Sequence, residues 1–131
     1  MNKAVLHDHL DGGLRANTAK DLAIKDNYKP LIDVEDIESF FNRESSESLE
    51  DYLEAFVHTT ALMTKYENLE RIAFEAAEDM HQHGITHYES RYAPLYSVNE
   101  TMTPENVIDA INSGFKQAEN IYGIKSGLIL C

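Results

Sequence analysis

The sequence is poor in cysteine, in basic residues and in long apolar runs. Its single cysteine, Cys131, permits no intramolecular disulfide, which fits a reducing compartment. The formal net charge of −12 argues against binding to nucleic acids or anionic membrane surfaces, because both require clusters of lysine and arginine. No apolar stretch approaches the roughly 18 residues of a membrane-spanning helix, and no secretory signal is visible. We therefore expect a cytoplasmic protein with no membrane and no nucleic-acid partner.

Two histidines, His7 and His9, stand at the end of the first apolar run, with one residue between them. Alternate side chains of a strand share a face, so the two imidazoles would form one side of a transition-metal site. A bare pair of this kind is a weak signal, because most such histidines lie on surfaces or in cores. A second pair, His81 and His83, falls on a predicted helix. There two residues turn about 200° around the axis, so these rings cannot share a metal.

Strands and helices alternate along the chain. We predict short strands at 3–7, 85–92 and 126–131. Helices are predicted at 17–27, with Pro30 ending that region, at 33–41 with Asp33 as its N-cap, at 48–65, at 68–83 before Gly84, and from Thr103 to Gly123. Apolar strands separated by helices pair in parallel through right-handed crossovers. Three such strands and about five helices predict an α/β fold. A complete (β/α)8 barrel needs roughly 200 residues or more, so we expect an incomplete barrel.

Two stretches of the pattern leave alternatives open. The helix predicted at 48–65 carries an apolar stripe, which either packs on the core or lines a ligand pocket at its edge: Leu49, Tyr52, Leu53, Phe56 and Val57. In the strand at 85–92, His87, Glu89 and Arg91 share one face, and neither face is plainly apolar. This strand is either an edge strand with one solvent-exposed face or a strand whose charged side points into a polar, functional interior.

The chain resembles the adenosine deaminase family of the metal-dependent amidohydrolase superfamily. Residues 6–15 resemble the family's opening motif, L-H-x-H-L-D-G, and residues 51–56 resemble its lid helix. Residues 88–94, Tyr-Glu-Ser-Arg-Tyr-Ala-Pro, resemble its second strand. The resemblance covers nearly the whole chain. It implies that residues 1–131 form the N-terminal part of one (β/α)8 TIM-barrel domain, with residues 17–83 as a helical, lid-like insertion after the first strand.

The resemblance also implies an activity, namely zinc-dependent hydrolytic deamination of adenosine to inosine and ammonia, within purine metabolism. His7 and His9 match the two first-strand ligands of a single Zn2+, and Asp11 matches the residue that hydrogen-bonds the ribose. Glu89 and Arg91 match a polar pair inside the barrel that supports its structure. Four residues match the apolar wall beside the purine: Leu49, Tyr52, Leu53 and Phe56.

Several of the family's functional residues have no counterpart in these 131 residues. They are the third histidine ligand, the glutamate that acts as general acid, the second catalytic histidine and a late-strand aspartate. We therefore assign no catalytic residue here and expect the chain alone to be inactive, as a truncated gene or a part of a longer protein would be. The alternatives are a deaminase of another aminopurine (adenine or an adenosine derivative) and a non-catalytic fragment. Expected partners are a purine nucleoside and, through open strand edges, a second copy of the chain.

Overall fold

The computed structural model describes residues 2–41 and 56–131 of the chain. Strands and helices alternate along it, as the sequence predicts. In chain order the elements are β1 (Lys3–His9), η1 (Leu10–Gly12), α1 (Ala16–Asp26), α2 (Lys29–Ile32), α3 (Ile37–Phe41), a helical segment at 56–61, α5 (Tyr66–Gln82), β2 (Ile85–Tyr92), η2 (Pro94–Tyr96), α6 (Pro104–Tyr122) and β3 (Lys125–Leu130).

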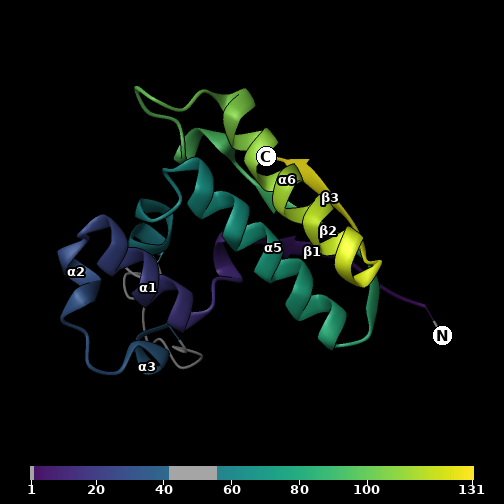
Figure 1. Ribbon diagram of the computed structural model, residues 1–131, viewed down its shortest axis with the longest axis horizontal. Helices are drawn as coiled ribbons and strands as arrows, with labels where there is room; N and C mark the ends of the chain where they lie inside the picture. The colour runs from purple at the N-terminus through teal and green to yellow at the C-terminus, as the bar shows by residue number, and fades with distance from the viewer. Residues whose placement is uncertain (1, 42–55) are drawn as a thin grey trace.

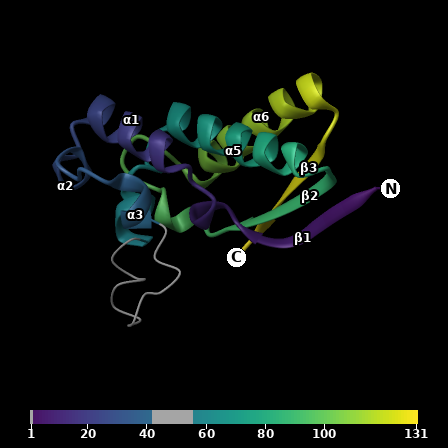
Figure 2. The ribbon, with the colours of Figure 1, turned by 90° about the horizontal axis from the view of Figure 1, so that it is seen from below.

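The strands form one parallel sheet in the order β1-β2-β3. Helices α5 and α6 lie side by side over one face of this sheet, and α1 to α3 lie beyond its end (Figures 1 and 2). The other face of the sheet carries no helix in the part of the chain that the structure describes. Parallel strands with helices on one side are the repeating unit of a (β/α)8 barrel. The chain therefore has the α/β fold of a partial barrel, as predicted.

The core lies between the sheet and the layer formed by α5 and α6. Small residues on α5, namely Ala73, Ala76 and Ala77, are buried and let α6 approach closely. The approach is closest at Gly114 of α6, where an added Cβ would lie 2.2 Å from the Glu70 carbonyl oxygen. Large side chains fill the rest of the core: Leu69, Ile72, Tyr88, Tyr92, Val107, Ile111, Phe115 and Ile124.

Both ends of α6 and the carboxyl end of α5 agree with the predicted signals. Thr103 caps α6, because its Oγ1 accepts a hydrogen bond of 3.2 Å from the backbone N–H of Asn106, and Pro104 occupies the first turn. Gly123 follows α6 with a φ of 78°, and Gly84 follows α5 with a φ of 79°. A side chain is strained at such positive φ angles, so these glycines end the helices and start β3 and β2.

The predicted boundaries around α2 and α3 are wrong. Asp33 does not cap a helix over 33–41, because it directly follows α2, and α3 begins only at Ile37. Pro30 does not end the helical region either, since it lies in the first turn of α2, where its missing N–H leaves no hydrogen bond unmade. The chain instead leaves α1 at Asn27, which has a left-handed φ of 55°.

The predicted boundary between the next two helices also needs correction. Residues 56–61 are helical, but the helix ends before Lys65, which is itself the N-cap of α5. Asn68 does not open α5; it is fully buried within it and donates hydrogen bonds to Asp26 Oδ2 at 2.7 Å and to the Leu62 carbonyl at 3.0 Å. Asparagine is typical of helix starts, and here its amide joins three segments instead.

The position of β2 in the sheet decides between the two interpretations of the strand at 85–92. It lies between β1 and β3, so the edge-strand interpretation is wrong. Tyr88 and Ser90 face the helices and are fully buried, whereas His87 and Glu89 lie on the opposite, open face. In a closed barrel that face is the interior, which agrees with the second interpretation.

Outer strands β1 and β3 each have one unpaired edge within the described residues. Such edges can pair with a second chain, so the predicted self-association stays a prediction. Among the described residues, no helix is both long enough and apolar enough to cross a membrane.

Candidate functional site

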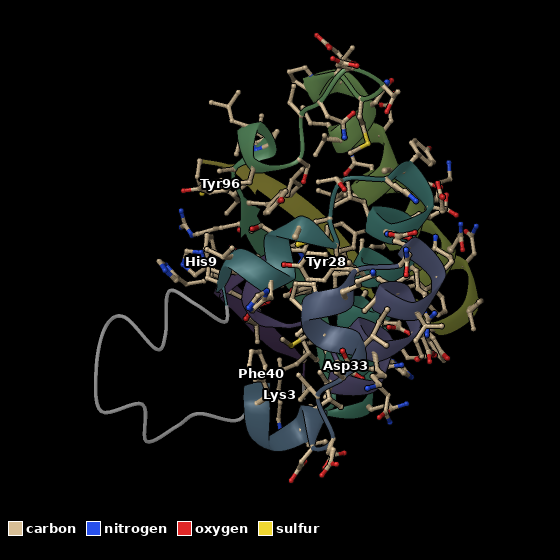
Figure 3. The ribbon with its side chains drawn as sticks, turned by 90° about the vertical axis from the view of Figure 1, so that its left-hand side faces the viewer. Lys3, His9, Tyr28, Asp33, Phe40 and Tyr96 are labelled. Carbon is tan, nitrogen blue, oxygen red and sulfur yellow. The ribbon has the colours of Figure 1, made fainter. Side chains whose placement is uncertain are left out.

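The candidate site lies at the carboxyl edge of the sheet. His9 ends β1 and is followed by η1, and Tyr92 ends β2 and is followed, after one residue, by η2. Figure 3 shows His9 and Tyr96 on the same side of the molecule. Loops at the carboxyl ends of parallel strands form the active sites of barrel enzymes. The residues that follow β1 and β2 are therefore the first place to seek functional side chains.

The His7 and His9 side chains lie together, as their spacing predicts. Their ring centroids are 5.4 Å apart, both side chains are exposed, and the rings meet at 68°. No hydrogen bond reaches either imidazole from residues 2–41 or 56–131. Two neutral imidazoles with free nitrogens fit two positions of a tetrahedral zinc site. No cluster of three histidine, cysteine, aspartate or glutamate side chains suited to a metal occurs within the described ranges.

An irregularity in β1 decides which face the two imidazoles occupy. Val5 pairs with Tyr88 and Asp8 pairs with Ser90, so β1 places two residues opposite one residue of β2. An extra residue of this kind is a β-bulge, and it reverses the alternation of side chains beyond it. Val5 packs against the core. Strict alternation would place His7 and His9 on the same face as Val5, but they do not lie there. They lie on the open face instead.

Asp11 comes next, in the short helix η1. Leu10 is fully buried and anchors this turn to the core, which leaves the Asp11 carboxyl half-buried beside the end of β1. Burial raises the pKa of Asp11 above its ordinary value, although backbone N–H groups of Asp11 and Gly12 oppose the shift. The Asp11 carboxyl also interacts electrostatically with the His9 imidazole, so it lies beside the histidine pair. Its predicted contact with ribose stays a prediction.

Arg15 fixes the segment that follows η1 to helix α5. Its Nε and Nη2 donate to the Asp79 carboxylate at 3.0 and 2.6 Å, and Nη2 also donates to Glu78 at 2.7 Å. Tyr122 of α6 donates a hydrogen bond to the other oxygen of Glu78. Charge-assisted bonds of this kind hold a chain segment in a defined orientation. The network therefore sets the path of the chain on leaving the candidate site.

The hydrogen bonds of Glu78 in this network lead to a prediction about how the stability of the fold depends on pH. The hydrogen bonds from Tyr122 and Arg15 lower the pKa of Glu78 below its ordinary value. A carboxyl with a lowered pKa in the folded state stabilises the fold above its ordinary pKa of about 4.3, and this contribution is lost as the pH falls through the lowered pKa. We expect Glu78→Gln to be less stable than the wild type at pH 7, with the difference shrinking on acidification. Urea midpoints at pH 7, 4 and 3 measure the difference between Glu78→Gln and the wild type, with the exposed Glu100→Gln as control. A constant difference across that range would contradict the prediction.

Phe56 is the one predicted wall residue within the described part of the chain. It lies edge-on to Tyr96 of η2, with ring centroids 5.5 Å apart. Leu49, Tyr52 and Leu53 lie outside the described residues, so their role as a purine wall stays a prediction. Tyr96 is a residue that the sequence analysis missed. Its position just beyond the end of a predicted strand was the signal that could have found it.

The polar pair of β2 lies near the histidines. His9 pairs with Arg91 across the sheet, and Glu89 lies 3.3 Å from the imidazole Nε2 of His87. The Nε of Arg91 is buried and has no hydrogen-bond partner among the residues that the structure describes. The predicted role of Glu89 and Arg91 as structural support stays a prediction.

Comparisons with known proteins agree with this arrangement. The sequence model of the family described as Adenosine deaminase matches residues 2–131. An adenosine deaminase from Mycobacterium avium is 43% identical over 120 residues, covering 89% of this chain and 33% of that protein. Adenosine deaminase 1 from Streptomyces coelicolor is 40% identical over 136 residues, covering 98% of this chain and 34% of that protein. The chain thus spans about a third of the length of these relatives.

A solved structure supports the fold in the same way. An amidohydrolase from Burkholderia ambifaria, determined with bound zinc, superposes with a TM-score of 0.84 at 28% identity. The match covers 99% of this chain and 35% of that one.

Proposed function

The chain belongs to the adenosine deaminase family, and we propose that it supplies part of a site for the hydrolytic deamination of adenosine to inosine and ammonia. The observation that carries the proposal is the pair of imidazoles at the carboxyl end of β1. They lie 5.4 Å apart, face the open side of the sheet and are followed by a half-buried carboxyl group. The family match over residues 2–131 supports it.

In this proposal each residue has a definite task. His7 and His9 are the residues that would hold zinc, each through one neutral ring nitrogen. When bound, zinc supplies the activation of water as a nucleophile near neutral pH. Asp11 accepts a hydrogen bond from a ribose hydroxyl and so orients the nucleoside at the end of β1. Phe56 and Tyr96 present apolar surface that excludes water from the base.

Adenosine is the substrate that the comparisons favour. The relatives at 40–43% identity are named adenosine deaminases. An adenine deaminase from Arthrobacter aurescens is only 22% identical, so its likeness, with a TM-score of 0.80, extends to the fold alone. We therefore place adenine and adenosine derivatives second.

The activity test uses a hybrid enzyme in which this chain replaces the matching N-terminal segment of the Mycobacterium avium relative. With zinc present, we expect the hybrid to release ammonia from adenosine faster than from adenine, and the 131-residue chain alone to release none. Cooperative thermal unfolding of the hybrid serves as the folding control. A folded, zinc-loaded hybrid without adenosine turnover would contradict the proposal, as would turnover by the chain alone.

A further inference from the structure

Strand β1 is joined to β2 by a side-chain hydrogen bond beneath the sheet. The hydroxyl of Tyr88 donates to the Asp8 carboxylate, with 2.6 Å between the oxygens. Tyr88 has no exposed surface, and its ring lies edge-on to Phe115 of α6 at 5.9 Å. Asp8 is therefore drawn towards the helix-covered face of the sheet, where the tyrosine ring is already fixed by the core.

Asp8 occupies a position whose orientation bears on both histidines. It lies between His7 and His9 and directly after the bulge that begins beyond Val5. Because neighbouring side chains of a strand point to opposite faces, an inward-facing Asp8 places both imidazoles outward. A slip of one residue would exchange the two faces of the strand. The slip would turn Asp8 outward and bring the imidazoles against the helices.

A slip of one residue would weaken the hydrogen bonding of the buried Tyr88 hydroxyl. The hydroxyl of Tyr88 would lose its charged acceptor and keep only the neutral hydroxyl of Ser90, and a hydrogen bond to a charged group is stronger than one between neutral groups. Burial and the neighbouring Asp8 carboxylate both raise the pKa of Tyr88, so its phenol stays protonated and remains a donor at neutral pH. The register with Asp8 inward is therefore favoured over the slipped register, because it keeps the hydrogen bond between the buried Tyr88 hydroxyl and the Asp8 carboxylate.

We propose that the hydrogen bond between Asp8 and Tyr88 is a latch that holds His7 and His9 in the orientation in which both bind one metal ion. Asp8 and Tyr88 are then positioning residues for a site that neither of them touches. The inference rests on the proposed function in that it takes the two histidines as ligands. It adds the residues that decide whether the two rings act together.

The test uses a copper probe that needs only the two histidines. Cu2+ bound to iminodiacetate keeps open positions that accept two imidazoles, and electron paramagnetic resonance distinguishes binding by two rings from binding by one. We expect the wild-type chain to bind the probe through two imidazoles. Tyr88→Phe should weaken this binding about tenfold, the low end of the effect of residues that orient metal ligands, and shift the spectrum to one imidazole.

Two further variants separate positioning from general stability. Tyr92→Phe removes another buried tyrosine hydroxyl of β2, which pairs with Ser97 and not with β1, and should bind the probe as the wild type does. Asp8→Asn keeps an oxygen that accepts from Tyr88 and should retain two-ring binding, whereas Asp8→Ala should lose it. Equal weakening in Tyr88→Phe and Tyr92→Phe would overturn the latch, as would unchanged binding in Tyr88→Phe.

A His9→Ala chain separates failure of the latch from failure of the proposed function. If His9→Ala loses the probe while Tyr88→Phe keeps it, only the latch is wrong. If His9→Ala binds the probe through two imidazoles as the wild type does, the paired histidines are not the ligands, and the latch and the proposed metal site both fail. Turnover by the hybrid enzyme is measured separately and does not depend on the copper result.

Discussion

Replacing His9 with alanine is expected to lower zinc affinity by more than about 100-fold. Loss of an outer-shell partner alone costs about 10- to 100-fold, and removal of a direct ligand costs more. His7 would remain as the one imidazole that the end of β1 supplies to the site. In the hybrid enzyme, adenosine turnover should fall with the zinc content. Equilibrium dialysis of the hybrid and ammonia release measure the two effects.

His83→Ala is the matched control for this experiment. It also removes one member of a His-x-His pair, but His83 follows helix α5, and its Nδ1 lies 2.8 Å from the Asp79 carbonyl oxygen. Zinc content and turnover should therefore stay at the wild-type level. Unchanged zinc binding in His9→Ala, or equal losses in both variants, would rule out the first strand as the zinc-binding element.

Replacing Gly114 with alanine is expected to lower the free energy of unfolding by about 3 kcal/mol or more, the upper end for overpacked cores. An added Cβ would lie 2.2 Å from the Glu70 carbonyl oxygen and 2.8 Å from the Phe74 amide nitrogen. Both atoms belong to the backbone of α5, so no side-chain rotation can relieve the clash. The helices α5 and α6 would have to separate, and the gap would expose the core beneath them.

Gly127→Ala is the control, because no atom lies within 4 Å of a Cβ added at this position of β3. Its free energy of unfolding should stay within about 0.5 kcal/mol of the wild type. Urea denaturation followed by circular dichroism measures both variants, and lower yield with an earlier midpoint is expected for Gly114→Ala alone. Equal midpoints for the two variants would show that α5 and α6 do not pack as closely as the structure places them.

Much of the fold could be predicted because local chemistry determines it. The strand at 85–92 was predicted with its observed bounds, and Thr103, Pro104 and Gly123 marked both ends of α6. The region around Asp33 could not be predicted in the same way. Asp33 has the side chain of a helix cap, but the choice between caps and turns there depends on how α2 packs, which a local pattern does not contain.

The candidate site was predicted only in part for the same reason. His7, His9 and Asp11 follow one another in the sequence, so their proximity could be foreseen. Tyr96 meets Phe56 across 40 positions of sequence, and Tyr88 reaches Asp8 across 80. Contacts of this range arise from the packing of strands and helices, and no periodicity in the sequence reports them.

The sequence by itself determined that His7 and His9 share a face, because a strand repeats every two residues. It did not determine which face. Counting from Val5, which packs against the core, strict alternation would turn both imidazoles towards the helices. The tertiary structure decided otherwise, because an extra residue in β1 and the bond from Tyr88 to Asp8 direct the histidines to the open side. The pairing of β1 with β2 requires that bulge, and pairing exists only in the folded sheet.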